Sequence, residues 1–367
     1  MKKVNIKSNS KSYTITIGLK NLVPLTKFLR ENNFQKIMLI FDTNTAKLFK
    51  SKFLPLERSF DLHSCVIKSG ERSKSWETIN HIASNLLKKN FDRKTILIAV
   101  GGGVVGDITG FTGSIYQRGI AYLQYPTTLL AQVDSSVGGK TAINHQLGKN
   151  MLGTFYQPSA VFISISSLKK LPRREFFSGL TEVTKYALIM DVLFLKYLLN
   201  NKSLIFNYES LTLETIIFKC CKYKSRVVNL DEKETGVRAI LNFGHTLGHA
   251  IENCLGYRKI LHGEAVAIGM LFAAKLSSVY SSLSSIEYEF IKKSLFELRL
   301  ISKESLVFFS KIPEKNLLNA MRKDKKNFNG NISFVLLEKI GKANFNNFIE
   351  QKDLKKILSQ FKKCLNI

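Results

Sequence analysis

The feature that most constrains the fold of this chain is a glycine-rich turn placed directly after a strongly apolar segment. Residues Thr95–Val100 predict a buried strand, and residues 101–107, with the sequence GGGVVGD, follow it at once. Gly101, Gly103 and Gly106 match the spacing G-x-G-x-x-G, in which glycine lets the backbone approach a pyrophosphate and the next helix adds its positive N-terminal dipole. This strand–turn–helix arrangement favours a nucleotide-binding site.

The surrounding sequence extends this arrangement into a parallel α/β sheet. Two further apolar runs, Ile37–Asp42 and Cys65–Ile67, predict strands, and Trp76–Lys89 carries apolar residues at the three-to-four spacing of an amphipathic helix. Alternating strands and helices are typical of parallel sheets that are covered by helices. We therefore expect an α/β fold with a Rossmann-like, NAD-binding sheet domain over residues 1–171.

Beyond Pro172 the sequence becomes mainly helical. Helices are expected over Leu180–Leu199, Leu213–Leu230, Gly244–Asn253, Ala265–Ser278 and Glu287–Leu298, and only Ile332–Leu337 resembles a strand. This change predicts a second, mainly α-helical domain over residues 172–367 that binds metal and substrate. A chain of 367 residues with 45% apolar content is long enough for two packed cores.

The nucleotide interpretation departs in one respect from the usual dinucleotide fingerprint. Asp42, the acidic residue that closes a predicted strand, lies before the glycines instead of about 20 residues after them. Contact between Asp42 and a ribose is therefore a hypothesis at this point. A P-loop is excluded, because the first glycine of a pattern ending in Gly139-Lys140-Thr141 would fall on Asp134.

Three of the six histidines, His245, His249 and His262, lie close together in the second half of the chain. His245 and His249 are four residues apart and so share one helix face, from which two imidazoles can converge on a metal. Neutral imidazole with a carboxylate is the usual zinc donor set. The cluster predicts a metal site, but the spacing does not decide which histidines are ligands and which one is instead buried or caps a helix.

The residues alone also do not decide which carboxylate would complete this metal site. Glu182 stands in a mostly apolar helix, where a carboxylate needs a cation or a metal to offset its burial, while Glu252 and Glu264 compete by proximity to the histidines. Cations in otherwise uncharged segments lie near these motifs, at Arg118, Lys140, Lys149, Lys185, Lys224 and Arg238. Together they suit a small substrate that bears both a phosphate and a carboxylate.

The net charge of +27 raises nucleic acid as a partner, because clustered Lys and Arg gain affinity by displacing counterions. The basic residues are spread along the chain without a basic arm, and a nucleic-acid-binding protein leaves the histidine cluster unexplained. Five cysteines without a CxxC pair indicate reduced thiols, and no stretch reaches the roughly 20 apolar residues of a membrane span. We expect a cytoplasmic protein with no nucleic-acid or membrane partner.

In their order along the chain, these motifs resemble the 3-dehydroquinate synthase family. The matching segments are 101–107, 125–134, 138–141, 148–153, 179–185, 231–234, 238–249 and 262–266. The resemblance implies a phosphorus–oxygen lyase of the shikimate pathway, which leads to aromatic amino acids. It would convert 3-deoxy-D-arabino-heptulosonate 7-phosphate, a phosphorylated sugar acid, into 3-dehydroquinate and phosphate by transient NAD oxidation, phosphate elimination, reduction and intramolecular aldol closure.

The resemblance also implies roles for individual positions. Zinc, or Co2+ in its place, would be held by Glu182, His245 and His262. The catalytic residues would be His249 and Glu234, which transfer protons, with Lys140 and Asp134. Substrate contacts are implied for Arg118, which would reach across the interface of a homodimer, and for Lys149, Asn150, Lys185, Lys224, Arg238 and Asn242. NAD contacts are implied for Asp42, Glu71, Lys74, Gly102, Gly103, Asp107, Thr127 and Thr128.

A few positions and alternatives stay open beside this assignment. One lysine of Lys325-Lys326 also falls at a site position of the family, and the pattern does not choose between them. Ser164 and Ser166 stand where relatives usually carry aspartates, and neither is a matched ligand. The nearest alternatives are a polyol dehydrogenase of the glycerol dehydrogenase type and another sugar phosphate cyclase, although the basic residues favour a phosphorylated substrate over glycerol.

Overall fold

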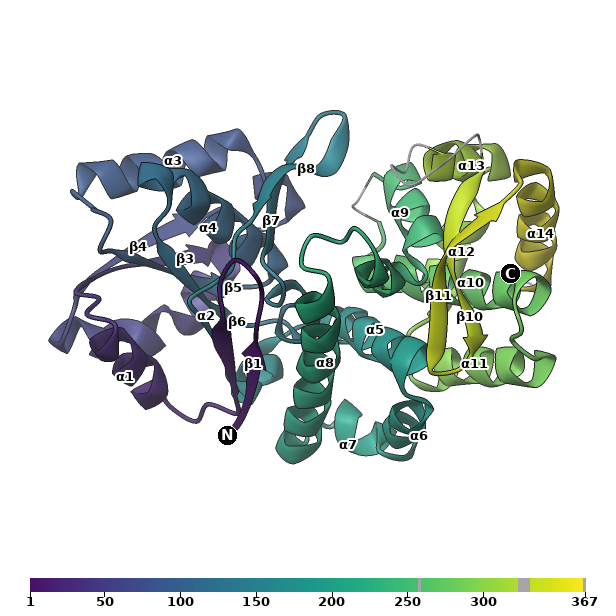
Figure 1. Ribbon diagram of the computed structural model, residues 1–367, viewed down its shortest axis with the longest axis horizontal. Helices are drawn as coiled ribbons and strands as arrows, with labels where there is room; N and C mark the ends of the chain where they lie inside the picture. Colours follow the sequence, from purple (N-terminus) through teal and green to yellow (C-terminus); the bar gives the residue numbers. More distant parts are fainter. Residues whose placement is uncertain (257–258, 323–330, 366–367) are drawn as a thin grey trace. The chain divides into compact units, whose positions relative to one another are not determined.

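The computed structural model describes residues 1–256, 259–322 and 331–365, and the chain divides into two compact units (Figure 1). The first unit comprises residues 1–172 and 208–233, and the second comprises residues 173–207 and 234–367. The sequence pattern assigns residues 208–233 to the second domain, and here the structure differs. Helix α8 (Ser210–Leu230) packs on strand β1 (Lys2–Ile6), so this segment belongs with the sheet unit.

A seven-stranded sheet forms the centre of the first unit, in the order β1-β2-β9-β6-β5-β3-β4. After β1, its strands are β2 (Tyr13–Ile17), β3 (Lys36–Asp42), β4 (Asp61–Ile67), β5 (Ile96–Gly101), β6 (Ala121–Pro126) and β9 (Ala160–Ile163). Its neighbours pair in parallel, except that β1 and β2 form an antiparallel hairpin. The part β4-β3-β5-β6-β9 has the 2-1-3-4-5 order of doubly wound sheets, whose switch point lies between β3 and β5.

Helices cover both faces of this sheet. They are α1 (Val23–Glu31), α2 (Thr43–Phe53), α3 (Trp76–Lys88) and α4 (Gly103–Ile115). Leu29 and Phe49 of α1 and α2 belong to the core on one face, and Ile82 and Ile108 of α3 and α4 belong to the core on the other. Burial on both sides explains why the strands are continuous apolar runs, and it confirms the strands and the helix predicted in this part of the chain.

One hairpin of the first unit has no counterpart in the sequence prediction. Strands β7 (Lys140–His145) and β8 (Gly148–Phe155) pair antiparallel, and no strand is predicted over these residues. Strand β8 has no buried residue, so it lacks the apolar alternation by which a half-buried strand is recognised.

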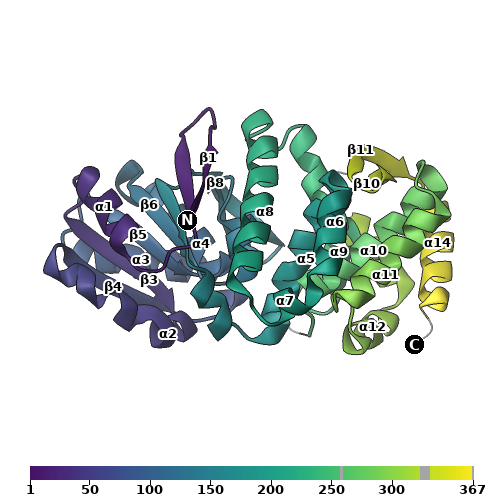
Figure 2. The same ribbon diagram turned by 90° about the horizontal axis from the view of Figure 1, so that it is seen from below.

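The second unit is mainly helical. Its helices are α5 (Arg173–Met190), α6 (Val192–Asn200), α7 (Lys202–Phe206), α9 (His245–Cys254), α10 (His262–Tyr280), α11 (Ser285–Glu297), α12 (Lys303–Ser310), α13 (Glu314–Arg322) and α14 (Gln351–Cys364). Helix α10 is central and contacts α5, α9 and α11 (Figure 2). It is buried nearly all round, which is why its sequence is apolar on every face.

Two expectations for this unit need correction. The segment Leu180–Leu199 is not one helix, because Asp191 interrupts it and caps α6 by accepting a hydrogen bond from the backbone N–H of Phe194 at 3.1 Å. The predicted strand Ile332–Leu337 is confirmed within β10 (Ile332–Lys339), but it pairs with a second strand, β11 (Lys342–Ile349). Three of the eight residues of β11 are asparagines, which are uncommon in strands, so its sequence resembles a loop.

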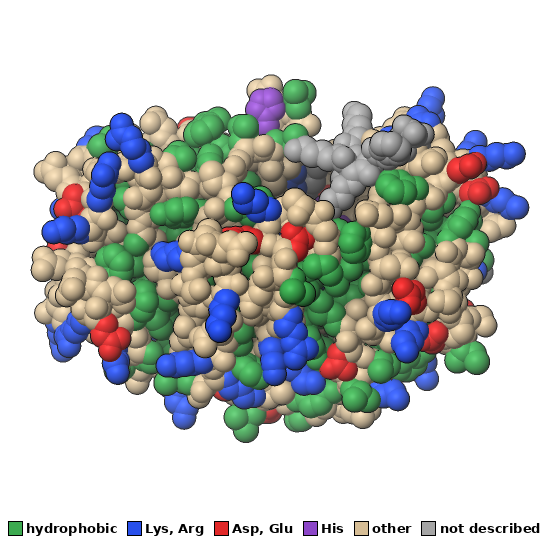
Figure 3. Space-filling model, in the orientation of Figure 1, with side chains coloured by type: hydrophobic (Ala, Val, Ile, Leu, Met, Phe, Trp, Pro, Cys, Tyr) green, Lys and Arg blue, Asp and Glu red, His purple; other side chains and the backbone are tan. Residues whose placement is uncertain are grey.

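Basic side chains do not gather into one patch on the face of the molecule shown in Figure 3. Lys and Arg side chains are scattered over the visible face and are interspersed with acidic and apolar ones (Figure 3). Within the part of the chain that the structure describes, no helix combines the length and the apolar character that crossing a membrane requires.

Candidate active site

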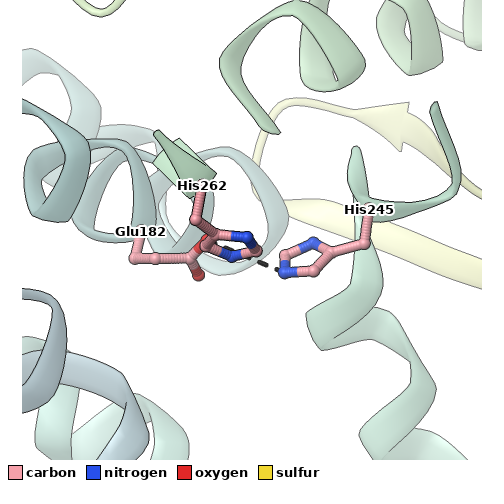
Figure 4. Close-up of side chains that lie close together, drawn as sticks. All are labelled: Glu182, His245 and His262. Atoms are coloured by element: carbon pink, nitrogen blue, oxygen red, sulfur yellow. Dashed lines mark ion pairs between the residues drawn. The ribbon is translucent and has the colours of Figure 1, made fainter. Parts of the chain in front are cut away.

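A carboxylate and two imidazoles converge in the second unit (Figure 4). Glu182 lies in the middle of α5, His245 is the first residue of α9, and His262 is the first residue of α10. The Nε2 atoms of both histidines lie 3.7 Å from Oε1 of Glu182. Ligand atoms that each bind a tetrahedral zinc at about 2.0–2.1 Å stand roughly 3.3 Å apart, so this arrangement is close to that of a metal donor set.

The other nitrogen of each ring is held by a hydrogen-bond acceptor. Nδ1 of His262 lies 3.1 Å from Oε2 of Glu252, and Nδ1 of His245 lies 3.2 Å from the carbonyl oxygen of Phe243. When Nδ1–H donates to these acceptors, the lone pair stays on Nε2, on the side of Glu182. Metal-binding imidazoles are ordinarily fixed in this way by an acceptor behind the ring.

Glu182 is fully buried, and its carboxylate is poorly satisfied without a metal. Among the described residues, neither of its oxygens accepts a hydrogen bond. Lys185, one turn further along α5 and also buried, forms an ion pair with Oε2. A buried carboxylate without hydrogen bonds is costly, and coordination of a divalent cation by Oε1 would offset this cost. The three residues therefore fit a zinc ion.

Burial lowers the pKa of His245 well below its ordinary value of 6.5, and the positive charge of Lys185 lowers it further. The ring is consequently neutral near pH 7, which is the form that binds metals. A second group, formed by His249, Glu252 and His262, also brings donor atoms within 4.8 Å of one another. In that group, however, Glu252 already accepts from Nδ1 of His262, which suits a supporting role better than coordination.

Glu264, the third carboxylate near the histidines, has a structural role. It accepts a hydrogen bond from the backbone N–H of Leu261 at 2.8 Å and forms a two-point contact with Arg174 at 2.7 and 2.8 Å. It therefore fixes the start of α10, where His262 lies. Gly244 fixes the start of α9 with a φ of +81°, and a Cβ there would lie 2.5 Å from Cγ of Met270 in α10.

A pocket lies beside the histidines in the same unit. Its lining includes Glu234, Asn242, His245 and His249 together with residues of the β10–β11 hairpin. The side-chain N–H of Asn242 donates to Oε1 of Glu234 at 2.6 Å, and the rings of His245 and His249 lie 5.3 Å apart. The pocket thus brings together the two residues expected to transfer protons and one residue expected to contact substrate. Arg238, just before Asn242, is buried.

The residues expected at the NAD site lie along one edge of the sheet in the first unit. Asp42 ends β3, Gly102 and Gly103 follow β5, and Thr127 and Thr128 follow β6; parallel neighbours have their carboxyl ends on the same side. This edge contains the switch point between β3 and β5. Because β3 and β5 are neighbours in space, Asp42 lies next to the glycine-rich turn although it precedes that turn in sequence.

The glycine-rich turn has the close packing that a cofactor cradle needs. Gly102 is the N-cap of α4, and a Cβ there would lie 3.0 Å from Cγ2 of Thr128. At Gly106 a Cβ would lie 2.7 Å from Oε1 of Gln124 on β6, so this glycine allows close packing of helix on strand. Glycines at the N-terminus of α4 therefore let the backbone come close to a ligand, which fits the pyrophosphate of NAD.

A polar network joins further expected residues in the same unit. The buried ammonium of Lys74 lies 2.5 Å from Oδ2 of Asp107 and also contacts Oδ1 of Asn150. Burial raises the pKa of Asp107, and the charge of Lys74 opposes that shift. Asn144 of β7, which the sequence reasoning missed, hydrogen-bonds to the segments on both sides of this network.

Of the other residues expected at the site in the first unit, one lysine is buried and the remaining cations are at least partly exposed. Nζ of Lys224, buried on α8, lies 2.8 Å from both Oδ1 and the carbonyl oxygen of Asp134. Lys140 and Arg118 have exposed side chains, and Lys149 lies 3.9 Å from Glu71. Lys325 and Lys326 lie outside the described residues.

Solved structures with this fold define a class of sugar phosphate cyclases and related dehydrogenases. Over 98% of this chain, 2-deoxy-scyllo-inosose synthase matches with a TM-score of 0.89 and 24% identity, and 100% of that chain is covered. The 2-epi-5-epi-valiolone synthase of Streptomyces hygroscopicus matches over 96% of this chain and 98% of its own, with a TM-score of 0.85 and 24% identity. These likenesses confirm the predicted α/β class with a Rossmann-like N-terminal part and a helical C-terminal part.

Within this class, the chain belongs to the 3-dehydroquinate synthase family. The model of the 3-dehydroquinate synthase N-terminal domain matches residues 64–178, and that of the C-terminal domain matches residues 179–327. The 3-dehydroquinate synthase of Thermodesulfovibrio yellowstonii is 45% identical over 363 residues, which cover 98% of this chain and 100% of that protein. That of Francisella tularensis subsp. mediasiatica is 45% identical over 96% of each chain. The predicted family is confirmed.

Proposed function

We propose that this protein is an NAD- and metal-dependent lyase that converts 3-deoxy-D-arabino-heptulosonate 7-phosphate into 3-dehydroquinate and phosphate. The observation that carries the proposal is the convergence of Glu182, His245 and His262 in a chain that aligns with 3-dehydroquinate synthases over nearly its whole length. Relatives of the same fold are described with NAD+ and with Co2+ or Zn2+ bound.

The residues that would hold the two cofactors follow from the contacts already given. Zinc would be held by Glu182, His245 and His262, and the pyrophosphate of NAD by the turn at Gly102 and Gly103. When bound, zinc would lower the pKa of adjacent substrate hydroxyls and NAD would reversibly accept a hydride, so that the reaction has no net redox change. The remaining NAD contacts would come from Asp42, Glu71, Lys74, Asp107, Thr127 and Thr128.

Proton transfer would fall to His249 and Glu234. Loss of phosphate from C7 requires removal of the neighbouring C6 proton, and a base must lie within hydrogen-bond reach of it. The pocket lined by both residues supports this role, and Asn242 holds the Glu234 carboxylate by a hydrogen bond of 2.6 Å.

The remaining positions would contact the substrate. Its phosphate and carboxylate call for cations and amide donors, and the fixed fork of an arginine suits either group. Arg238 and Lys185 are both buried. Opposite charges attract more strongly in the protein interior than in water, so these two cations would bind an anionic group of the substrate strongly. The other contacts would come from Lys149, Asn150, Lys224, Asn242, Asp134 and Lys140, and Asp134 and Lys140 would also take part in catalysis.

The test is phosphate release from 3-deoxy-D-arabino-heptulosonate 7-phosphate with catalytic NAD and added zinc, with and without a chelator. We expect release that needs both cofactors and leaves no NADH behind. A chain of the same fold that is a polyol dehydrogenase would instead release no phosphate and accumulate NADH on glycerol. The glycerol dehydrogenase of Schizosaccharomyces pombe shares this fold, with a TM-score of 0.66 over 95% of this chain and 88% of its own at 12% identity, so this control is needed.

We further infer a homodimer in which Arg118 of each protomer serves the site of its partner. The support is that Arg118 is exposed and that it follows Gln117 in a turn where both residues have positive φ. Sedimentation should give twice the mass of the chain. Mixing an Arg118→Ala protein with an inactive His249→Ala protein should restore activity, because mixed dimers would contain one intact site.

A further inference from the structure

We propose that Asn144 is a positioning residue that holds the NAD-site segment Glu71–Lys74 and the substrate residue Asn150 in one fixed arrangement. The proposal rests on the proposed function, because that function gives Glu71, Lys74 and Asn150 their roles. It adds a residue whose contacts are with groups expected to bind the cofactor and the substrate, and which sets the relative position of those groups.

The contacts of Asn144 reach both sides of the network. Its backbone N–H donates to the carbonyl oxygen of Lys74 at 2.8 Å. Its side-chain N–H donates to Glu71, to Oε1 at 3.0 Å and to the carbonyl oxygen at 3.3 Å. Its side-chain oxygen accepts from the backbone N–H of Asn150 at 2.9 Å. One side chain therefore joins the segment after β4 to the far strand of the β7–β8 hairpin.

An asparagine is needed for these bonds, because its amide donates and accepts at the same time. An aspartate could still accept from Asn150 but could not donate to Glu71, and it would set a second negative charge against that carboxylate. Asn150 has a φ of +55°, a conformation that a non-glycine residue keeps only when its surroundings hold it. The bond from its backbone N–H to Asn144 is one such restraint.

Lys74 shows why the arrangement matters. Its ammonium contacts both Asp107, expected at the NAD site, and Asn150, expected at the substrate. A shift of the hairpin relative to residues 71–74 would break one of these contacts or the other. By holding both ends, Asn144 lets one buried cation serve the two subsites.

The experiment compares Asn144→Ala and Asn144→Asp in zinc-loaded protein. NAD binding is followed by the fluorescence of Trp76, the single tryptophan of the chain, which lies two residues after Lys74. Substrate use is followed by KM and kcat for phosphate release. The alanine variant should raise both the Kd for NAD and the KM by about three- to ten-fold, the effect of one lost hydrogen bond.

The aspartate variant separates the effect on NAD binding from the effect on the KM for the substrate. It should raise the Kd for NAD at least as much, because Glu71 faces a like charge, while KM stays within about two-fold of wild type because the bond to Asn150 remains. Asn85→Asp is the matched control: this asparagine lies on α3 of the same unit and bonds only within its own helix, to the carbonyl oxygen of His81 at 2.8 Å, among the contacts of the described residues. It should change neither constant.

The proposal is overturned if Asn144→Ala leaves both constants unchanged, or if Asn144→Asp raises KM as much as Asn144→Ala does, which would indicate a general loosening of the hairpin. If the wild-type protein binds NAD but releases no phosphate, the proposed function fails by itself. The NAD titrations still decide whether Asn144 acts on Glu71. If the alanine variant does not fold, the aspartate variant and its control carry the test.

Discussion

Nδ1 of His262 lies 3.1 Å from Oε2 of Glu252, and the Nε2 atom of the same ring lies 3.7 Å from Oε1 of Glu182. The two carboxylates therefore stand on opposite nitrogens of one imidazole. Glu252 is buried on α9, seven residues after His245, so a single helix carries one expected metal ligand and the residue that orients another. The metal site is thus coupled to the packing of α9 against α10.

This relationship predicts that Glu252→Gln weakens zinc binding by about ten- to a hundred-fold, the usual effect of losing such a partner. Glutamine keeps the size of the side chain, but it loses the charge that makes the imidazole more basic. Competition with a chromophoric chelator measures the affinity directly.

Glu289→Gln is the control for Glu252→Gln. Glu289 is an exposed glutamate on α11 that lies 4.0 Å from Lys292. Zinc affinity in this variant should equal that of the wild type. Equal affinity in Glu252→Gln as well would mean that Glu252 does not support the metal.

The metal ligands themselves give a second prediction. Glu182→Ala and His245→Ala should lose zinc and activity together, because three ligands do not tolerate the loss of one. Lys149→Ala should keep full zinc occupancy while KM for the substrate rises. Metal analysis of the purified proteins decides between these outcomes, and zinc retained by the Glu182 variant would favour the alternative set of His249, Glu252 and His262.

Much of the fold could be predicted from the sequence because buried strands and helices have recognisable patterns of apolar residues. Strands β3 and β5 are covered on both faces and so are continuous apolar runs, and α10 is apolar on every side for the same reason. Strand β8 has no buried residue and β11 has one, so neither strand is recognisable as an apolar run. The break at Asp191 was missed because its capping bond depends on a single polar residue in an apolar stretch.

The candidate site could be predicted only in part. The density of histidines indicated a metal, and the charge of Glu182 in an apolar segment indicated a buried group with a partner. The roles of Glu252 and Glu264 could not be separated, because proximity in sequence does not say which nitrogen or which backbone group a carboxylate reaches. The spacing of Glu252 from His249, three residues along one helix, did carry a signal that they share a face.

Helix α8 gives a prediction for pH. Glu209 caps its first turn by accepting hydrogen bonds from the backbone N–H groups of Leu211 at 2.9 Å and Thr212 at 2.6 Å, and these bonds lower the pKa of Glu209 below its ordinary value of 4.5. The stabilisation is present in full above pH 4.5 and is lost as pH falls through the lowered pKa. Melting temperatures from about pH 6 to about pH 3.5 should fall less steeply in Glu209→Gln than in wild type. The exposed Glu57→Gln variant should follow the wild-type curve.

Lys224→Met gives the last prediction and links stability to the substrate site. Nζ of Lys224 donates to the side chain and to the carbonyl oxygen of Asp134, so it joins α8 to the short π-helix Ala131–Ser135. Methionine fills the same space but removes both bonds, and we expect the free energy of unfolding to fall by about 2–3 kcal/mol. Urea unfolding measures this loss, and phosphate release should show a raised KM.

Lys222→Met on the exposed side of the same helix is the control for Lys224→Met, and it should change neither stability nor KM. Combining Lys224→Met with Asp134→Asn should recover part of the stability, because the carboxylate that Lys224 pairs with is then removed. It should recover none of the activity, because Asp134 is itself expected to contact the substrate. Recovery of both would mean that the pair is structural and that Lys224 does not bind the substrate.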